Sequence, residues 1–510
     1  MKQIPLYRHL LASCTLIALL LLASCTDKTP DYARLIEKDV PLVVRIDVKQ
    51  IGEKSGMADR KETIEKAQKR MSEAGLSAEA MTKMKAIADD PAEAGVDLRK
   101  PLLFFAEQPD APSAALVGAL HDSGKFTELL QTISKEAGAG DALKTEGELK
   151  TFQHQDLLIV FNDDWFYLTN QDRDESAKAE AVKKRFEADD EHSIRSREDF
   201  KEMCRAEGFM QMLLNGSALE QLGTKSKEIR DMLALMPANT KASDFAVCFD
   251  LSSKKGELTL TAQSIAMTDE AKKALEQNYE SLGKVDGKLL AYVPEDALLT
   301  AATHIDGSKI YSQLEASLSK EGDITAEQKE LIKNMLSSLK GDVVVSFNSM
   351  DMRNGPKAQL LADATSMDGL NQIVKQNKNM FGVVEMAPGQ YSVNGLYFFG
   401  VYNNVFYLSS IAPLAEMKKA EKPIDAGDFK GKYGYMLLNL KAIAALPVFA
   451  GTDAAGSSPE AFAFQLLKNC DKLDFSMSEL NKGELRLLMA DKSADPIEYF
   501  TRQAEKAANL

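Results

Sequence analysis

The sequence has few of the residues that build metal centres and reactive sites, with only five cysteines, five histidines and one tryptophan among 510 residues. The histidines beyond the N-terminal segment are His121, His154, His192 and His304, and no two of them have the spacing of metal ligands. Neither a CxxC nor an HExxH motif occurs. We therefore expect no metal site and interpret these histidines as scattered surface residues.

Sequence motifs of the common enzymes are also missing. The chain has no GxSxG motif, no Walker-type phosphate-binding loop and no GxGxxG motif, which disfavours the commonest hydrolases, nucleotide-binding proteins and dehydrogenases. A carboxylate pair for glycoside hydrolysis is not recognisable among 76 acidic residues. The formal net charge of −14 disfavours nucleic acid and anionic lipid headgroups as partners. We expect no cofactor, and a binding protein rather than an enzyme.

Cysteine and tryptophan usage gives two further indications. Cys204, Cys248 and Cys470 are odd in number and widely spaced, which does not indicate a disulfide framework. Whether two of them pair stays open, although Cys248 lies in the strand-like stretch 245–249, where a buried thiol is expected. The single tryptophan, Trp165, makes a sugar-binding platform of flat aromatic rings a secondary alternative.

The N-terminus has the features of a secretory signal. Lys2 and Arg8 form a basic segment, and the nine residues from Thr15 to Ala23 form an apolar one. Nine residues are too few to span a hydrocarbon core, which needs about 20. The pattern is instead typical of a cleaved signal peptide.

Leu22-Ala23-Ser24-Cys25 resembles the lipobox of bacterial lipoproteins, in which the cysteine thiol receives a diacylglycerol group. The same four residues end at Cys14, but almost no apolar run precedes that copy. We predict a signal peptide over 1–24, lipid attachment at Cys25 and a tether over 25–34. Because two or more acyl chains anchor a protein stably, a triacylated Cys25 would hold the chain at a membrane.

The sequence contains internal similarities in a constant order, which predict a tandem duplication. The matching pairs are Asn162–Leu168 with Tyr402–Leu408, Gly208–Asn215 with Gly434–Asn439, Lys255–Leu258 with Lys482–Leu485, and Pro101–Phe105 with Asp342–Phe347. In the first pair an apolar run meets an Asn/Asp turn and returns as an aromatic strand, so both copies are predicted to be β-hairpins, with positive φ at the turns.

Hairpins that alternate with separate helical patterns predict an α+β fold, built from two antiparallel-sheet units with inserted helices. We place the first repeat at 35–280 and the second at 281–510. Helices are expected at 60–74, 78–88, 125–137, 199–206, 227–235, 309–319, 326–340 and 367–378. The small and polar residues from Gly451 to Pro459 predict a surface loop, with a binding lid as the alternative.

The chain resembles an uncharacterised family of Bacteroidetes lipoproteins that carry a domain of unknown function. The resemblance rests on Cys25, on Val40–Asp47 and on Gly208–Asn215, and it implies no catalytic residue. Surface-exported members of such lipoproteins carry several acidic residues after the cysteine, whereas here only Asp27 follows. The resemblance therefore favours the periplasmic face of the outer membrane, with exposure at the cell surface as the alternative.

These observations lead to a functional hypothesis. We expect a membrane-anchored lipoprotein of the cell envelope that acts as a binding or scaffold component for another envelope protein. An envelope hydrolase with an unrecognised site and a glycan-binding lipoprotein of a nutrient-uptake system are the alternatives. A polar cluster in a deep cleft would favour the enzyme, an extended apolar face would favour binding, and exposed stacked aromatic rings would favour the glycan.

Overall fold

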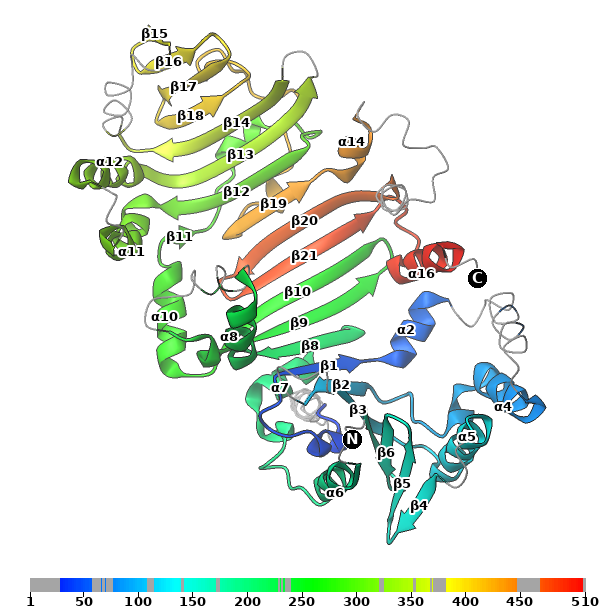
Figure 1. Cartoon of the computed structure of the whole chain (residues 1–510). Coiled ribbons are helices and arrows are strands. Elements are labelled where there is room, and N and C mark those ends of the chain that lie inside the picture. The colour runs from blue at the N-terminus through cyan, green and yellow to red at the C-terminus, as the bar shows by residue number, and fades with distance from the viewer. Residues whose placement is uncertain are drawn as a thin grey trace, which may run out of the picture. The chain divides into compact units, whose positions relative to one another are not determined.

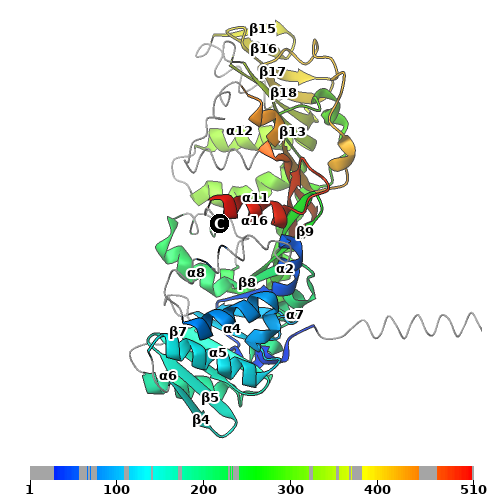
Figure 2. The ribbon, with the colours of Figure 1, turned by 90° about the vertical axis from the view of Figure 1, so that its right-hand side faces the viewer.

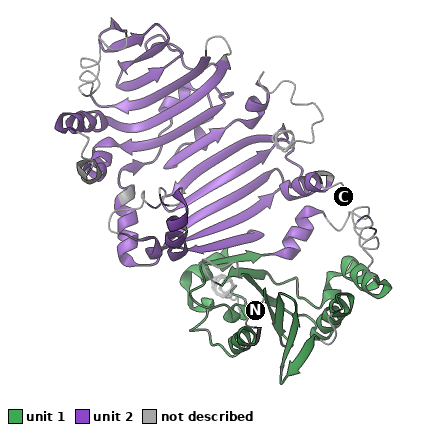
Figure 3. Cartoon of the chain, viewed as in Figure 1, with its two compact units in different colours: residues 1–46, 77–207 green, residues 47–76, 208–510 purple. Residues whose placement is uncertain are grey.

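The computed structural model describes residues 28–56, 66, 69, 77–107, 114–138, 142–170, 175–227, 230, 233, 240–320, 325–351, 355–366, 369, 382–446 and 468–507. The signal segment and Cys25 lie outside these residues, as do the loop 451–459 and most of the helices expected at 60–74, 227–235 and 367–378. The chain divides into two compact units, residues 1–46 with 77–207 and residues 47–76 with 208–510 (Figure 3). The predicted boundary between two sequence repeats at residue 281 is not tested by this division into compact units, and it stays a prediction.

Unit 1 is built on one antiparallel sheet. Its strands are β1 (Leu42–Ile46), β2 (Leu102–Ala106), β3 (Ala114–Ala119), β4 (Leu143–Glu146), β5 (Leu149–His154), β6 (Leu157–Phe161) and β7 (Trp165–Asn170). Their spatial order is β1–β2–β3–β7–β6–β5–β4. The helical elements are η1 (Asp31–Leu35), α4 (Ala78–Asp89), η3 (Pro91–Ala94), α5 (Ser123–Glu136), α6 (Glu175–Arg185), η4 (Ile194–Ser196) and α7 (Glu198–Arg205).

Helix α5 shows why the sequence forms this unit. Asp122 caps its first turn by accepting a hydrogen bond from the Lys125 backbone N–H. Phe126 and Leu130, one turn apart, are buried against Phe161 and other residues of β5 to β7. The rings of Phe126 and Phe161 meet edge to face at 5.1 Å, a favourable aromatic geometry.

Unit 2 has a longer antiparallel sheet. Its strands are β8 (Met210–Asn215), β9 (Phe245–Lys254), β10 (Glu257–Ala266), β11 (Leu282–Gly283), β12 (Leu299–Asp306), β13 (Leu339–Asp351), β14 (Gly355–Ala364), β15 (Val383–Ala387), β16 (Gln390–Val393), β17 (Tyr397–Tyr402), β18 (Val405–Ser409), β19 (Gly434–Leu438), β20 (Cys470–Glu479) and β21 (Lys482–Met489). The order is β8–β9–β10–β21–β20–β19–β12–β13–β14–β18–β17–β16–β15, and β11 also pairs with β12. The stretch from β12 to β15 therefore has the strand order of unit 1.

Helical elements accompany this sheet. They are α2 (Val48–Ser55), α8 (Gly216–Lys225), η5 (Ala242–Asp244), α10 (Asp269–Tyr279), η6 (Lys288–Tyr292), α11 (Gly307–Lys320), α12 (Ala326–Ser337), η7 (Ala426–Asp428), α14 (Leu440–Ala444) and α16 (Pro496–Ala507). Figures 1 and 2 show that α8, α10, α11, α12 and α16 lie on one side of the unit 2 sheet, near the ends of its strands. The other side of β12 to β18 carries a core cluster in which Leu361 and Tyr407 are buried with Leu290 and Phe429.

The α+β prediction is confirmed, and so are the two aromatic hairpins, β6–β7 and β17–β18. Their turns differ, however. Asn403 and Asn404 have φ of 50° and 61°, as a tight hairpin turn requires. At the first turn the expected positive φ is wrong, because the Asn162 side chain accepts hydrogen bonds from the backbone N–H groups of Asp164 and Trp165 and shapes the turn instead.

Five expected helices are confirmed as α4, α5, α7, α11 and α12, with one boundary wrong by more than two residues. Helix α12 begins at a capping box in which Thr325 and Gln328 exchange side-chain and backbone hydrogen bonds. It was expected to continue to Lys340, but it ends at Ser337 and β13 begins at Leu339. The apolar residues that follow the helix pair with β12 and β14, so sheet pairing overrides the helical pattern there.

Candidate functional site

One face of the unit 2 sheet carries a continuous row of apolar side chains. Residues directly opposite each other on antiparallel strands point to the same face, so the register defines the row. From β16 to β8 it consists of Tyr391, Phe399, Leu408, Leu360, Val345, Ala301, Met436, Phe475, Leu485, Leu260, Leu251 and Met210. No polar residue interrupts this row over twelve strands. We call it the apolar row.

Part of the apolar row is open to solvent. The exposed fractions of Leu408, Val345 and Met436 are 47%, 41% and 37%. Large apolar side chains that are exposed close together on one sheet face can mark an interaction surface. The row thus has the character of an interaction surface.

Helix α16 covers the same face beside the apolar row. Its residues Tyr499 and Phe500 pack with Leu438, Leu473 and Leu487, which stand two positions along the strands from Met436, Phe475 and Leu485. A residue two positions along a strand points to the same face. The row therefore lies on the helix-bearing side of the sheet that Figure 2 shows.

The reverse face of the strands β20 and β21 carries a buried ion pair, whereas on β19 it carries Tyr435 and Leu437 of the core cluster. Asp474, only 1% exposed, accepts two hydrogen bonds from Arg486, at 2.8 Å from Nε and 3.0 Å from the second nitrogen. Tyr435 is buried beside this pair, and burial raises the pKa of its hydroxyl. Lys432 lies 4.3 Å from the centre of the Tyr435 ring, and burial lowers the pKa of its ammonium group.

The polar cluster that comes nearest to an enzymatic arrangement is centred on Asp342. This carboxylate is 1% exposed and accepts hydrogen bonds from the backbone N–H of Gly287 at 2.7 Å and from His304 Nδ1 at 2.9 Å. Asp363 accepts one from the Asp342 backbone N–H. Burial, followed by the nearby Asp342 charge, raises the pKa of Asp363. The contacts tie the 286–287 turn to the sheet, which is a structural role.

The other residues singled out in the sequence are dispersed. His121 and His192 are exposed, and His192 is a partner of Asp189, whereas His154 and His304 are half-buried, so the expectation of plain surface residues is wrong for these two. Cys204, Cys248 and Cys470 are buried thiols, as expected for Cys248. Among the described residues, no three His, Cys, Asp or Glu side chains are grouped so that they could hold a metal ion.

Trp165, the aromatic residue considered for sugar binding, contacts an arginine of unit 1. The guanidinium group of Arg34 lies over the Trp165 ring at 5.3 Å from its centre, a cation–π contact. One face of the ring is therefore occupied, and Trp165 offers no open platform on that side.

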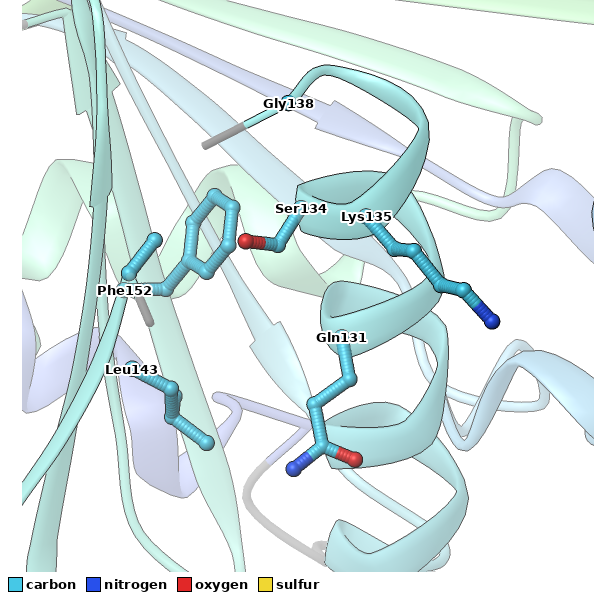
Figure 4. Close-up of a pocket in the computed structure, with 7 residues that line it drawn as sticks. Gln131, Ser134, Lys135, Gly138, Leu143 and Phe152 are labelled. Atoms are coloured by element: carbon cyan, nitrogen blue, oxygen red, sulfur yellow. The ribbon is translucent and has the colours of Figure 1, made fainter. Parts of the chain in front are cut away.

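Unit 1 also has a small pocket of about 340 Å³ between α5 and the β4–β5 hairpin (Figure 4). Phe152 and Leu143 face Ser134 and Gln131 of the helix across the pocket, whereas Lys135 points away from it. The described residues that line the pocket do not place an acid and a base opposite each other.

Cys25, the one site residue predicted from the sequence, lies outside the described residues. Within the described parts of the chain, no helix combines the length and apolarity needed to cross a membrane. The apolar row was missed by sequence analysis, because each strand contributes one residue to it.

The fold and the apolar face define a two-unit α+β protein built on antiparallel sheets. The chain belongs to the family described as "Domain of unknown function (DUF4836)", whose model matches residues 32–486. Among curated proteins none matches the chain.

Crystal structures of TP0453 are similar to part of this fold. Form I is 12% identical over 50% of this chain and 87% of its own, with a TM-score of 0.27, and form IV is 13% identical over 46% and 81%, with a TM-score of 0.26.

Proposed function

We propose that this chain is a lipid-anchored lipoprotein of the cell envelope whose apolar row binds a partner protein. The single observation that carries the binding role is the row itself, twelve apolar residues in register with three of its large side chains exposed. Burying such side chains is worth about 25 cal/mol per Å² of apolar surface. A partner that covered the row would gain this free energy.

The length of the apolar row favours a protein as the occupant. Neighbouring strands are about 4.8 Å apart, so twelve strands give a row of about 50 Å. A bilayer core of two leaflets is about 30 Å thick, and one acyl chain accordingly extends about 15 Å. The exposed residues Leu408, Val345 and Met436 lie within five adjacent strands, about 20 Å, a length that one acyl chain does not fully cover and an amphipathic helix of a partner does.

Charged substitutions in the apolar row should abolish this binding. Val345→Glu and Met436→Glu place a carboxylate at exposed positions on either side of Ala301, where the fold tolerates charge but an apolar partner does not. We expect at least a tenfold loss of the partner in cross-linking from native membranes followed by mass spectrometry. Desolvating one unpaired carboxylate costs several kcal/mol.

The matched control is Ser252→Glu, which adds the same charge to the reverse face of the same sheet. Ser252 pairs with Thr259, and Thr259 pairs with Arg486. A partner that survives in Ser252→Glu and disappears in Val345→Glu supports the proposal. Equal recovery from both variants, or recovery of lipid in place of protein, would contradict it.

The membrane anchor is supported by the sequence. Lys2, Arg8 and the apolar stretch Thr15–Ala23 precede the lipobox at Cys25 in the order that export and acylation require. We place the protein in a bacterium of the Bacteroidetes, at the outer membrane and facing the periplasm. A lipid anchor would also raise the concentration of the apolar row near envelope partners.

A tandem duplication belongs to the same proposal. The recurring strand order supports it, and so does the pairing of β10 with β21. When Lys255–Leu258 is aligned with Lys482–Leu485, Thr259 corresponds to Arg486, and these two residues stand directly opposite each other. A pair of equivalent residues at the centre of a contact is what a two-fold relation between repeats produces.

An experimental structure would test the duplication. Superposition of β1–β7 on β12–β18 should bring the turn at Asn162 onto the turn at Asn403 and Asn404. If those turns fall in unrelated positions of the two sheets, the repeats do not share an origin.

A further inference from the structure

Another pocket lies in unit 2, on the face of the sheet opposite the apolar row. Its volume is about 500 Å³, and it is bounded by Tyr292, Asn348, Gln359, Ile411, Met417 and Lys418 together with the charged residues around its rim. Gln359 adjoins Leu360 of the apolar row on β14, and adjacent strand residues point to opposite faces. The volume is within the range of ligand-binding pockets, about 300–1,000 Å³.

Two antiparallel segments hold the wall of this pocket in place. The backbone N–H of Glu295 donates to the Lys422 carbonyl, and that of Ile424 donates to the Val293 carbonyl, both at 2.9 Å, on either side of the antiparallel pair Pro294 and Pro423. At the rim, the Lys422 ammonium lies 3.7 Å from the Glu295 carboxylate. The pocket is therefore shaped by backbone hydrogen bonds of described residues and does not depend on side-chain packing alone.

The floor of the pocket holds an acceptor with no donor. Gln359 is 2% exposed, and its Nε2 donates to the Tyr292 carbonyl at 3.0 Å. Its Oε1 is buried and receives no hydrogen bond from any group that the structure describes. The hydroxyl of Ser346, opposite Gln359 on β13, donates instead to Asn348 Oδ1 at 2.7 Å. An unsatisfied buried acceptor costs about 1–3 kcal/mol, so a donor that reached this atom would stabilise the site.

Asn348 supplies the complementary group. Because its Oδ1 accepts from Ser346, its Nδ2 is the atom left to donate, and the residue is half-buried in the same pocket. An acceptor and a donor presented by two side-chain amides match the N–H and C=O groups of a peptide backbone.

We propose that this pocket binds a short peptide through its backbone. A peptide N–H donates to Gln359 Oε1 and a peptide carbonyl accepts from Asn348 Nδ2, while Met417, Ile411 and Tyr292 contact an apolar side chain. A flexible methionine suits varied peptide side chains. Tyr292 is the one aromatic residue of the pocket lining, so stacking of a sugar between rings has no support here. The inference does not depend on the proposed function of the apolar row.

Ligand-observed NMR on the full-length protein in detergent micelles tests the proposal. The first probe is trialanine blocked at both ends. The second, for comparison, is a trimer of N-acetylglucosamine, which also carries amides. We expect saturation transfer to the peptide and at least a tenfold weaker affinity for Gln359→Met, which keeps the side-chain length and removes the acceptor. Asn348→Ala should weaken binding as well, which keeps the test valid if one variant fails to fold.

The matched control is Gln390→Met, the same substitution on the same sheet face. Gln390 already accepts a hydrogen bond from the Tyr407 hydroxyl, at 3.4 Å, and it does not line the pocket. Unchanged peptide affinity in Gln390→Met supports the assignment. Equal peptide affinity in Gln359→Met and the wild type would overturn it. So would transfer to the sugar alone, or an absence of peptide binding, which would mean that only a buried water fills the site.

Discussion

Replacing Cys25 with serine should release the protein from membranes. A serine hydroxyl cannot form the thioether to diacylglycerol, and the apolar stretch Thr15–Ala23 is too short to span a bilayer by itself. We expect complete loss of fatty-acid label and recovery of the protein outside the membrane fraction. Metabolic labelling with a radioactive fatty acid, followed by immunoprecipitation, measures both.

Cys14 provides the control, because the same three residues precede it without an apolar run. Cys14→Ser should retain the label and the membrane location of the wild type. Label that persists in Cys25→Ser would show that acylation occurs elsewhere or that the chain is held by a different anchor.

Removing Asp474 should destabilise unit 2 more than any surface change. Asp474→Ala leaves the Arg486 guanidinium without its carboxylate in a largely buried position, and breaking a buried pair costs about 3–5 kcal/mol. We expect about 3 kcal/mol, the lower end, because 28% of the Arg486 side chain is exposed to water. Denaturant unfolding followed by circular dichroism gives the free energy of unfolding.

Glu484→Ala is a matched control on the next strand. Glu484 lies 3.9 Å from Lys482, and both side chains are more than a third exposed, so their ion pair should contribute less than about 1 kcal/mol. The double variant Asp474→Leu, Arg486→Met should recover much of the lost stability, because replacing both charges removes the unpaired one. An Asp474→Ala protein as stable as Glu484→Ala would show that the buried pair contributes little.

Local elements of the fold could be predicted from the sequence where one stretch contains all the determinants. The β6–β7 and β17–β18 hairpins are examples, because the two strands and the Asn-containing turn are contiguous. Helix α5 is another, since the spacing of Phe126 and Leu130 defines its buried side, although the cap at Asp122 starts the helix two residues before the predicted residue 125. The end of α12 was not predictable in this way, because the apolar residues after Ser337 belong to a strand whose neighbours lie elsewhere in the chain.

The sequence by itself determined the basic and apolar segments before Cys25, the hairpins and five of the eleven α-helices that the structure describes. Each of these follows from interactions within about twenty residues. Only the tertiary structure decided the apolar row and the pocket. Val345, Met436 and Leu485 are separated by up to 140 residues, and they form one row only because the strand register places them opposite each other. In the sequence, Gln359 likewise resembles an ordinary strand residue. Only the fold shows that it is buried and that its Oε1 has no donor among the described residues.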